Sequence, residues 1–182
     1  MPGGASSAGR RQKPLATGDT AGVALHGNAT TRYDDVALLS VASVLPSRVT
    51  SSDAIEERLS GVLRELKLKP GLLRRVAGVN ERRNWAAGES SDDATIRAGR
   101  RALDEAGVRP DQIGLLINTS VSRKHLEPSV AVRLHHGLGL PTSAINFDVA
   151  NACLGFINGM SLASGMIQSG QLDYAIIVNG ED

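Results

Sequence analysis

The segment DVANACLG, from Asp148 to Gly155, holds the only cysteine among 182 residues. Its pattern predicts a strand that ends near Asp148, a tight turn, and a helix rich in small residues over about 152–169. Cys153 then falls in the first turn of this helix, where the helix dipole and free backbone N–H groups favour a thiolate. The same N–H groups can hold the oxyanion of an acyl transfer. Cys153 is therefore a candidate nucleophile, and a buried core cysteine is the alternative that the residues leave open.

A second candidate is Glu127 in the stretch HLEPS. It precedes Pro128, which is predicted at the first position of a helix that runs to about Gly139. The helix dipole alone favours an acidic side chain there. The residues by themselves therefore explain Glu127 without any chemistry, and a role as a base depends on the resemblance described below.

The elements that must position these residues alternate along the chain. Strands are predicted over residues 35–45, 114–119, 144–149 and 174–180, and helices over residues 50–66, 70–78, 90–106, 128–139 and 152–169. Thr50 and Ser90 are the expected N-caps of two of these helices, because each is followed by an aspartate three residues later. The alternation predicts an α/β fold with a largely parallel sheet.

Composition excludes several classes of function. Twenty basic and nineteen acidic residues leave a net charge of +1, so no strong field attracts nucleic acid. The sequence holds no apolar run long enough to span a membrane. One cysteine indicates a reducing compartment, which we take to be the cytoplasm, and excludes a cysteine-rich metal site. Residues 1–33 are rich in Gly, Ser and Thr and are predicted to be a disordered tail without a secretory signal. No nucleotide-binding loop is found, and no cofactor is expected.

Four stretches together resemble one family in order and spacing. They are AGVNERR, ALDEAGVRPDQIGLLINTS, DVANACLGFINGM and GQLDYAIIVNGED. This chain is similar to the β-ketoacyl-ACP synthase III branch of the thiolase superfamily from about residue 34 to its end. Within that branch, LLINTSVSRKHLEPS followed by FDVANACLGFINGM resembles the OleA family, which joins two acyl-CoA molecules head to head in olefin biosynthesis. The resemblance implies that residues 34–182 are the N-terminal half of a thiolase-like fold, with a mostly parallel sheet flanked by helices.

What the resemblance implies about chemistry is a non-decarboxylative Claisen condensation. One acyl-CoA loads Cys153 as a thioester, and a second loses an α-proton to Glu127, which acts in trans across a homodimer. Acyl-CoA or acyl-ACP is a substrate in this scheme. Two alternatives stay open: a decarboxylative synthase III of fatty acid or polyketide biosynthesis, and a non-catalytic half that completes a partner chain.

The sequence departs from the family pattern in three respects. The family's condensation His and Asn belong to a second half that this chain does not include, so a continuation or a partner chain is expected to supply them. His125, His135 and His136 precede the nucleophile and are interpreted as surface or packing residues. The family's CoA-binding Trp and Arg fall at Leu72 and Val76, which leaves the CoA contacts unknown. Arg82 and Arg83 are interpreted as a solvated pair rather than as phosphate ligands.

Overall fold

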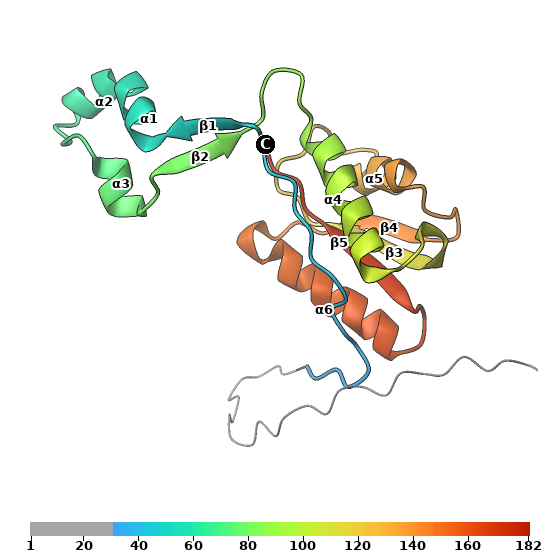
Figure 1. Cartoon of the computed structure of the whole chain (residues 1–182). Coiled ribbons are helices and arrows are strands. Elements are labelled where there is room, and N and C mark those ends of the chain that lie inside the picture. Colours follow the sequence, from blue (N-terminus) through green and yellow to red (C-terminus); the bar gives the residue numbers. More distant parts are fainter. Residues whose placement is uncertain (1–30) are drawn as a thin grey trace, which may run out of the picture. The chain divides into compact units, whose positions relative to one another are not determined.

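A computed structural model describes residues 31–182, and Tyr33–Asp182 form one unit. At its centre is a parallel sheet with the order β4-β3-β5, in which Leu116 lies beside Asn146 on one side and Ile176 on the other (Figure 1). The strands are β3 (Ile113–Asn118), β4 (Ile145–Asp148) and β5 (Tyr174–Val178). The predicted parallel sheet and three of the four predicted strands are thereby confirmed.

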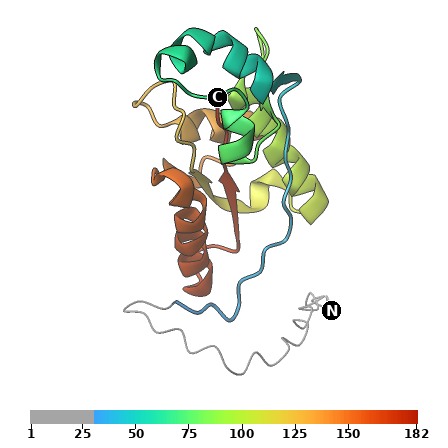
Figure 2. The same ribbon diagram turned by 90° about the vertical axis from the view of Figure 1, so that its left-hand side faces the viewer.

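Helices cover both faces of this sheet (Figures 1 and 2). One face packs against α4 (Ser91–Ala106) and α5 (Val130–Leu138), and the other packs against α6 (Gly155–Gln168). The first core includes Leu103, Leu116, Leu134, Leu138 and Ile176, and the second includes Leu115, Ile117 and Ala163. Successive β3 side chains enter opposite cores because side chains alternate along a strand. A short turn of 3₁₀ helix, η1 (Pro110–Gln112), leads into β3.

Helix α6 approaches the sheet closely because two of its three glycines, Gly155 and Gly159, face it. A Cβ atom at Gly159 would lie 3.0 Å from Cγ2 of Thr119 and 3.3 Å from Cγ2 of Ile177. At Gly155 it would lie 3.1 Å from the carbonyl oxygen of Thr119, which cannot move aside as a flexible side chain would. The small residues of the helix therefore set the position of the turn that precedes it.

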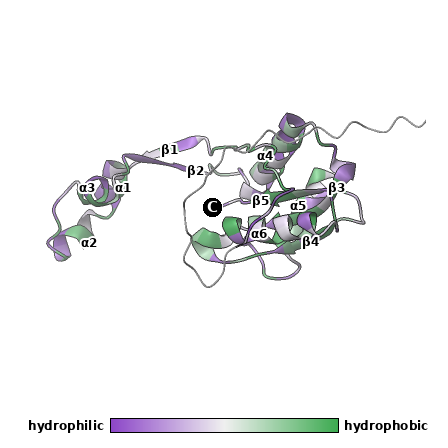
Figure 3. Cartoon of the chain, turned by 90° about the horizontal axis from the view of Figure 1, so that it is seen from below, coloured by the Kyte–Doolittle hydropathy of each residue, from purple (hydrophilic) through white to green (hydrophobic). Residues whose placement is uncertain are grey.

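A second, two-stranded sheet stands outside the central one. Its strands β1 (Arg48–Ser51) and β2 (Glu81–Asn84) are antiparallel, and three short helices connect them. These helices are α1 (Ser52–Arg58), α2 (Ser60–Glu65) and α3 (Leu72–Ala77). Neither strand was predicted, because RVTS and ERRN are short and polar; β2 is coloured as hydrophilic along most of its length in Figure 3.

The helix predicted over residues 50–66 begins later and is broken. Thr50 lies in β1 opposite Arg82, so the prediction of Thr50 as the N-cap is wrong. Ser51 takes that role instead, since its backbone is extended and its side chain accepts a hydrogen bond from the amide of Ala54 at 3.1 Å. The helix then breaks at Leu59, whose backbone leaves the helical region (φ −93°, ψ 6°).

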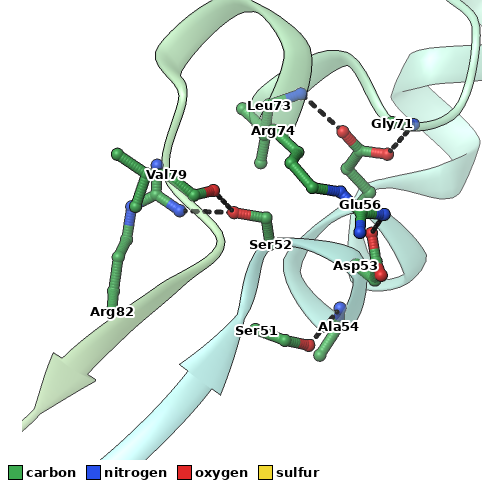
Figure 4. Close-up of polar contacts among 10 residues, drawn as sticks. All are labelled: Ser51, Ser52, Asp53, Ala54, Glu56, Gly71, Leu73, Arg74, Val79 and Arg82. Atoms are coloured by element: carbon green, nitrogen blue, oxygen red, sulfur yellow. Dashed lines mark hydrogen bonds and ion pairs between the residues drawn. The ribbon is translucent and has the colours of Figure 1, made fainter.

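Glu56 joins α1 to α3. Its carboxylate is buried and accepts hydrogen bonds from the amides of Gly71 at 2.5 Å and Leu73 at 2.6 Å (Figure 4). These two N–H groups, that of Leu73 first, lower the pKa of Glu56, and the positive charge of Arg74 acts in the same direction. Beside this contact, Ser52 donates to the carbonyl of Val79 at 2.5 Å. Polar contacts therefore hold these short helices together.

The strand predicted over residues 35–45 is absent from the described chain. The segment is extended but pairs with no strand, and Leu38, Leu39 and Val41 are exposed. An apolar run indicates burial without specifying a partner, and no strand among residues 31–182 pairs with this one. The prediction of a buried strand is wrong for this structure.

Helix α4 confirms its predicted start and end. Ser90 is the N-cap and Gly107, in the left-handed conformation, is the C-cap. The side chain of Ser90 makes no capping bond; its hydroxyl accepts instead from Lys124 Nζ at 3.3 Å. No helix among the described residues is long and apolar enough to cross a membrane. The tail predicted over residues 1–33 lies almost wholly outside the described residues.

The contact at Glu56 gives a pH-dependent prediction. Because the folded pKa of Glu56 is lowered, its contribution is complete above the usual carboxyl pKa and is lost as pH falls through the folded value. In the Glu56→Gln variant, the amides of Gly71 and Leu73 should lose hydrogen-exchange protection at neutral pH, and that protection should no longer respond to acid. Glu57→Gln, at an exposed neighbouring position, is the control; equal loss in both variants would contradict the assignment.

Candidate active site

Cys153 lies in a sharp turn between β4 and α6. The turn contains a 3₁₀ segment, η2 (Ala152–Leu154), in which the amide of Leu154 donates to the carbonyl of Asn151 at 2.9 Å. Ala152 has a φ of +42°, a conformation that costs energy for a residue with a side chain. A strained residue before an exposed nucleophile at a strand-to-helix turn is the geometry of a nucleophile elbow. Cys153 was expected within α6 itself and lies just before it.

Cys153 lines a cavity of about 300 Å³. The thiol is exposed, which does not agree with the alternative of a buried core cysteine. Within the described part of the chain, the backbone amide of Cys153 has no hydrogen-bond partner. The other lining residues are Thr119, Val121, Ala152, Phe156, Asn179 and Glu181. Except for Phe156 in α6, they lie in the segments that follow the carboxyl ends of the parallel strands, the usual position of ligand sites in such sheets.

Polar side chains join the ends of the three strands. The Asn118 side chain donates to Asp148 at 3.0 Å and accepts from the Ser120 hydroxyl at 2.6 Å. That hydroxyl in turn accepts from the amide of Gly180 at 2.9 Å. Asn118 is fully buried, so these bonds are shielded from water. The relative positions of the strand ends, and of the turns that leave them, are fixed by this chain of bonds.

Asp148 also caps helix α5. Its carboxylate accepts from the amides of Val130 at 3.0 Å and Ala131 at 2.9 Å, and only 9% of its side chain is exposed. The helix begins at Val130, two residues after Pro128, so the prediction that Pro128 occupies its first position is wrong. A carboxylate from another strand satisfies the first free N–H groups, which local sequence signals do not reveal.

Glu181 holds the loop 119–129 at its other end. Its carboxylate accepts from the amides of Val121 and Ser122, both at 2.8 Å, and its carbonyl accepts from Trp85 Nε1 at 2.7 Å. Burial alone would raise the pKa of Glu181, but these N–H donors hold it below its usual value. Sequence reasoning missed both Trp85 and Glu181. The signal that indicates Glu181 is its position directly after a parallel strand.

Glu127 is exposed on the same loop and is not among the described residues that line the cavity at Cys153. The structure therefore does not bring the two predicted site residues together in the described chain. The histidines follow the interpretation made from sequence: His125 and His136 are exposed, and His135 Nε2 lies 3.0 Å from the carbonyl of Pro141.

The residues considered for CoA binding lie elsewhere. Leu72 and Val76 are on α3, and neither lines the cavity at Cys153. Arg82 is half-buried and donates to the hydroxyl of Ser52 at 3.0 Å. Arg83 donates to the carbonyl of Pro46 at 3.2 Å. The interpretation of a solvated pair is therefore wrong for Arg82, whose guanidinium stabilises the small sheet.

Comparison with known proteins agrees with this geometry. Residues 147–182, which include the turn at Cys153, match the family model for 3-oxoacyl-[acyl-carrier-protein] synthase III. An acyl-CoA:acyl-CoA alkyltransferase of Xanthomonas campestris is 42% identical over 149 residues, which are 82% of this chain and 44% of that protein. Over the region that they share, this chain is similar to the synthase III branch of the thiolase superfamily.

Two further members of this branch extend the comparison. A β-ketoacyl-ACP synthase III of Cereibacter sphaeroides is 32% identical over 142 residues, which are 78% of this chain and 41% of that protein. A crystal structure of a cysteine-to-serine variant of Xanthomonas campestris OleA, with bound lauric acid and lauroyl-CoA, is 41% identical with a TM-score of 0.78. The match covers 82% of this chain and 44% of the OleA chain. The chain thus spans less than half the length of these relatives.

The cap on α5 gives a stability prediction. Asp148→Ala leaves the amides of Val130 and Ala131 without an acceptor, so the free energy of unfolding should fall by about 1–3 kcal/mol. Asp111→Ala is the control, because Asp111 pairs with Arg109 at the surface and should contribute less than about 1 kcal/mol. Urea denaturation measures both. Equal effects of the two substitutions would show that the cap does not stabilise the fold.

Proposed function

We propose that this chain carries the nucleophile of an acyltransferase, which takes an acyl group from acyl-CoA onto Cys153 as a thioester. The observation that carries the proposal is the exposed thiol in a strained turn, facing a cavity next to its own free amide. The relatives support it, since their names describe acyl transfer between two acyl-CoA molecules and synthesis of β-ketoacyl-ACP. The acyl-CoA is a substrate in this proposal, and no separate cofactor takes part.

The loading step uses groups within this chain. The Cys153 thiolate attacks the carbonyl carbon of acyl-CoA, and the negative charge moves onto the carbonyl oxygen. The Cys153 N–H is available to donate to that oxyanion because it makes no other bond among the described residues. Collapse of the tetrahedral intermediate breaks the bond to the CoA sulfur, which leaves as a thiolate and takes up a proton. The products are acyl-Cys153 and free CoA.

The second step forms a carbon–carbon bond. Glu127 of the partner subunit removes an α-proton from a second acyl-CoA, and the resulting carbanion attacks the carbonyl of acyl-Cys153. The bond from the carbonyl to sulfur breaks, the cysteine thiolate is released, and a β-ketoacyl-CoA or its hydrolysed β-keto acid forms. An acyl-CoA without a carboxyl group to lose offers no route to a carbanion except a base. This is the OleA-type, non-decarboxylative Claisen condensation.

Assembly follows from the place of Glu127. Because Glu127 is exposed and does not line the cavity at Cys153, we propose that it acts in trans within a homodimer. Further polypeptide, continuous or separate, supplies the part of the relatives' length that this chain does not span. The single cysteine suits a reducing compartment, and we propose the cytoplasm as the location.

A decarboxylative β-ketoacyl-ACP synthase III is the second candidate, favoured by the relatives that carry that name. In that reaction the loss of carbon dioxide from a malonyl group creates the carbanion, so Glu127 is dispensable. The remaining alternative, a non-catalytic half that completes another chain, requires no acylation of Cys153. The three candidates therefore differ in what they require of Cys153 and Glu127.

Acylation is predicted to occur on Cys153. Incubation of the native chain with lauroyl-CoA should add the mass of one lauroyl group, and the Cys153→Ala variant should gain none because it lacks a thiol. Intact-protein mass spectrometry measures both. Hydroxylamine should remove the label, as expected of a thioester. A folded native chain that stays unlabelled would contradict the proposal and favour the non-catalytic alternative.

Condensation is predicted to need Glu127. In the assembled protein, Glu127→Ala should lower the rate of β-keto product formation from two acyl-CoA molecules by about 100-fold to 10,000-fold, the range for loss of a general base. Acylation of Cys153 should be unchanged.

The position of Glu127 in trans can be tested with the same variants. Mixing Glu127→Ala with Cys153→Ala subunits should restore part of the activity, because one site of the mixed dimer then holds both groups. Loss of acylation in Glu127→Ala, or full activity with malonyl-ACP alone, would contradict its role as the base.

A further inference from the structure

Glu181 holds the start of the loop that carries Glu127. Its two carboxylate oxygens accept hydrogen bonds from the backbone amides of Val121 and Ser122, both at 2.8 Å. Further along the loop, the backbone groups of residues 123–128 make no hydrogen bond within the part of the chain that the structure describes. The path of the backbone towards Glu127 is therefore fixed mainly by this one carboxylate.

The other contacts of the loop lie at its far end or at the surface. Asp148 caps α5 after the loop and also pairs with Arg123 at 3.6 Å. Lys124 Nζ lies 3.8 Å from the carboxylate of Asp92, and 49% of the lysine side chain is exposed. Ion pairs of exposed side chains contribute little to stability, because water and salt screen them. Glu181 and Asp148 are thus the two groups that hold the loop, and Glu181 is the one that does not also cap a helix.

The fold fixes Glu181 from outside the loop. The residue follows β5 closely, and its carbonyl accepts from Trp85 Nε1 at 2.7 Å. The preceding amide, that of Gly180, donates to the Ser120 hydroxyl at 2.9 Å. Burial raises the pKa of Glu181, but the amide donors outweigh it and hold the pKa below its usual value. The side chain is therefore charged at neutral pH, and both oxygens remain acceptors.

We propose that Glu181 is a positioning residue for Glu127, because it fixes the loop in the path that brings Glu127 to the acylated cysteine of the partner subunit. This inference rests on the proposed function, in which Glu127 acts in trans as the base. It adds a division of labour between the subunits. The Glu181 of one subunit governs condensation at the cysteine of the other subunit, not at its own.

The competing assignment is a direct role for Glu181 at its own cysteine. Glu181 lines the cavity at Cys153 of the same chain, where its charge could act on the thiol or on the substrate. In the described chain, however, its two oxygens bond to loop amides and no hydrogen bond joins it to Cys153. The orientation of the carboxylate is thus set by the loop. The two assignments predict opposite results in mixed dimers.

The first measurement is the rate of condensation per acylated Cys153 in the assembled protein. In Glu181→Gln the side chain keeps only one carbonyl oxygen for the two loop amides, so the loop loses one of its bonds. The rate should fall by about 10-fold to 100-fold, since a misplacement of about 1 Å can cost about 100-fold. Asp182→Asn removes a charge at the exposed adjacent position and should leave the rate unchanged. An unchanged rate in folded Glu181→Gln would overturn the proposal.

Mixed dimers decide in which subunit Glu181 acts. Glu181→Gln mixed with Cys153→Ala creates a site in which an intact loop serves the remaining cysteine, so random mixing should return about one quarter of the native rate. Glu181→Gln mixed with Glu127→Ala creates no such site, and the rate should not exceed that of Glu181→Gln alone. The reverse pattern, or restoration in both mixtures or in neither, would refute the positioning role.

The Glu127→Ala variant separates this inference from the proposed function. If Glu127→Ala retains the full rate, the role of the base and the role of Glu181 both fail. If Glu127→Ala loses the rate and Glu181→Gln does not, only the positioning role fails. Should Glu181→Gln not fold by circular dichroism, Glu181→Asp decides, because it keeps the charge but withdraws the carboxylate from the loop amides. A full condensation rate in Glu181→Asp would then refute the positioning role.

Discussion

The carboxylate of Asp148 accepts hydrogen bonds from the first two amides of α5 and from the buried side chain of Asn118. The segments that carry Cys153 and Glu127 begin or end beside it. Five residues later the chain reaches Cys153. The loop that carries Glu127 ends at the helix that Asp148 caps. A single charged group therefore sets both the start of the turn at Cys153 and the end of the loop that carries Glu127. Hydrogen bonds to a charged group are stronger than bonds between neutral groups. Asp148 accepts three such bonds, from Val130, Ala131 and Asn118.

The turn at Cys153 shows how packing maintains a strained backbone. The left-handed conformation of Ala152 is unfavourable by itself and persists only where its surroundings fix it. Gly155 and Gly159 allow α6 to lie directly against the end of β3, and the hydrogen bonds among the three strand ends fix the other side. The exposed thiol is thus held between two rigid supports, a helix and a sheet.

How far the sequence predicts this structure depends on the range of the interactions involved. The strands at 113–118, 145–148 and 174–178 and helix α4 follow from local runs of apolar residues and from caps at Ser90 and Gly107. The position of Cys153 at a strand-to-helix turn follows in the same way. The start of α5 was missed because its cap comes from Asp148, eighteen residues away in the chain. Trp85 and Glu181 were missed for a similar reason, since their contact joins residues that are far apart in sequence.

Residues 35–45 illustrate the opposite limit. Their apolar character predicts burial, yet Leu38, Leu39 and Val41 are exposed. A strand is defined by its partner, and none lies beside these residues in the described chain. The short strands β1 and β2 are the converse case, because polar sequences become strands by pairing with each other. Periodicity reports which surface a side chain prefers, whereas hydrogen-bond pairing decides whether the backbone is a strand.

The pairing of β1 with β2 also bears on how such a chain can change over time. Arg48, at the start of β1, lies opposite Asn84, at the end of β2. The segment with the three short helices therefore begins and ends at neighbouring points of the structure. Residues can be inserted, deleted or exchanged among those helices without altering the spacing of the central strands or the turn at Cys153. Changes within residues 52–80 are therefore separated from the geometry of the turn at Cys153 by the paired strands β1 and β2.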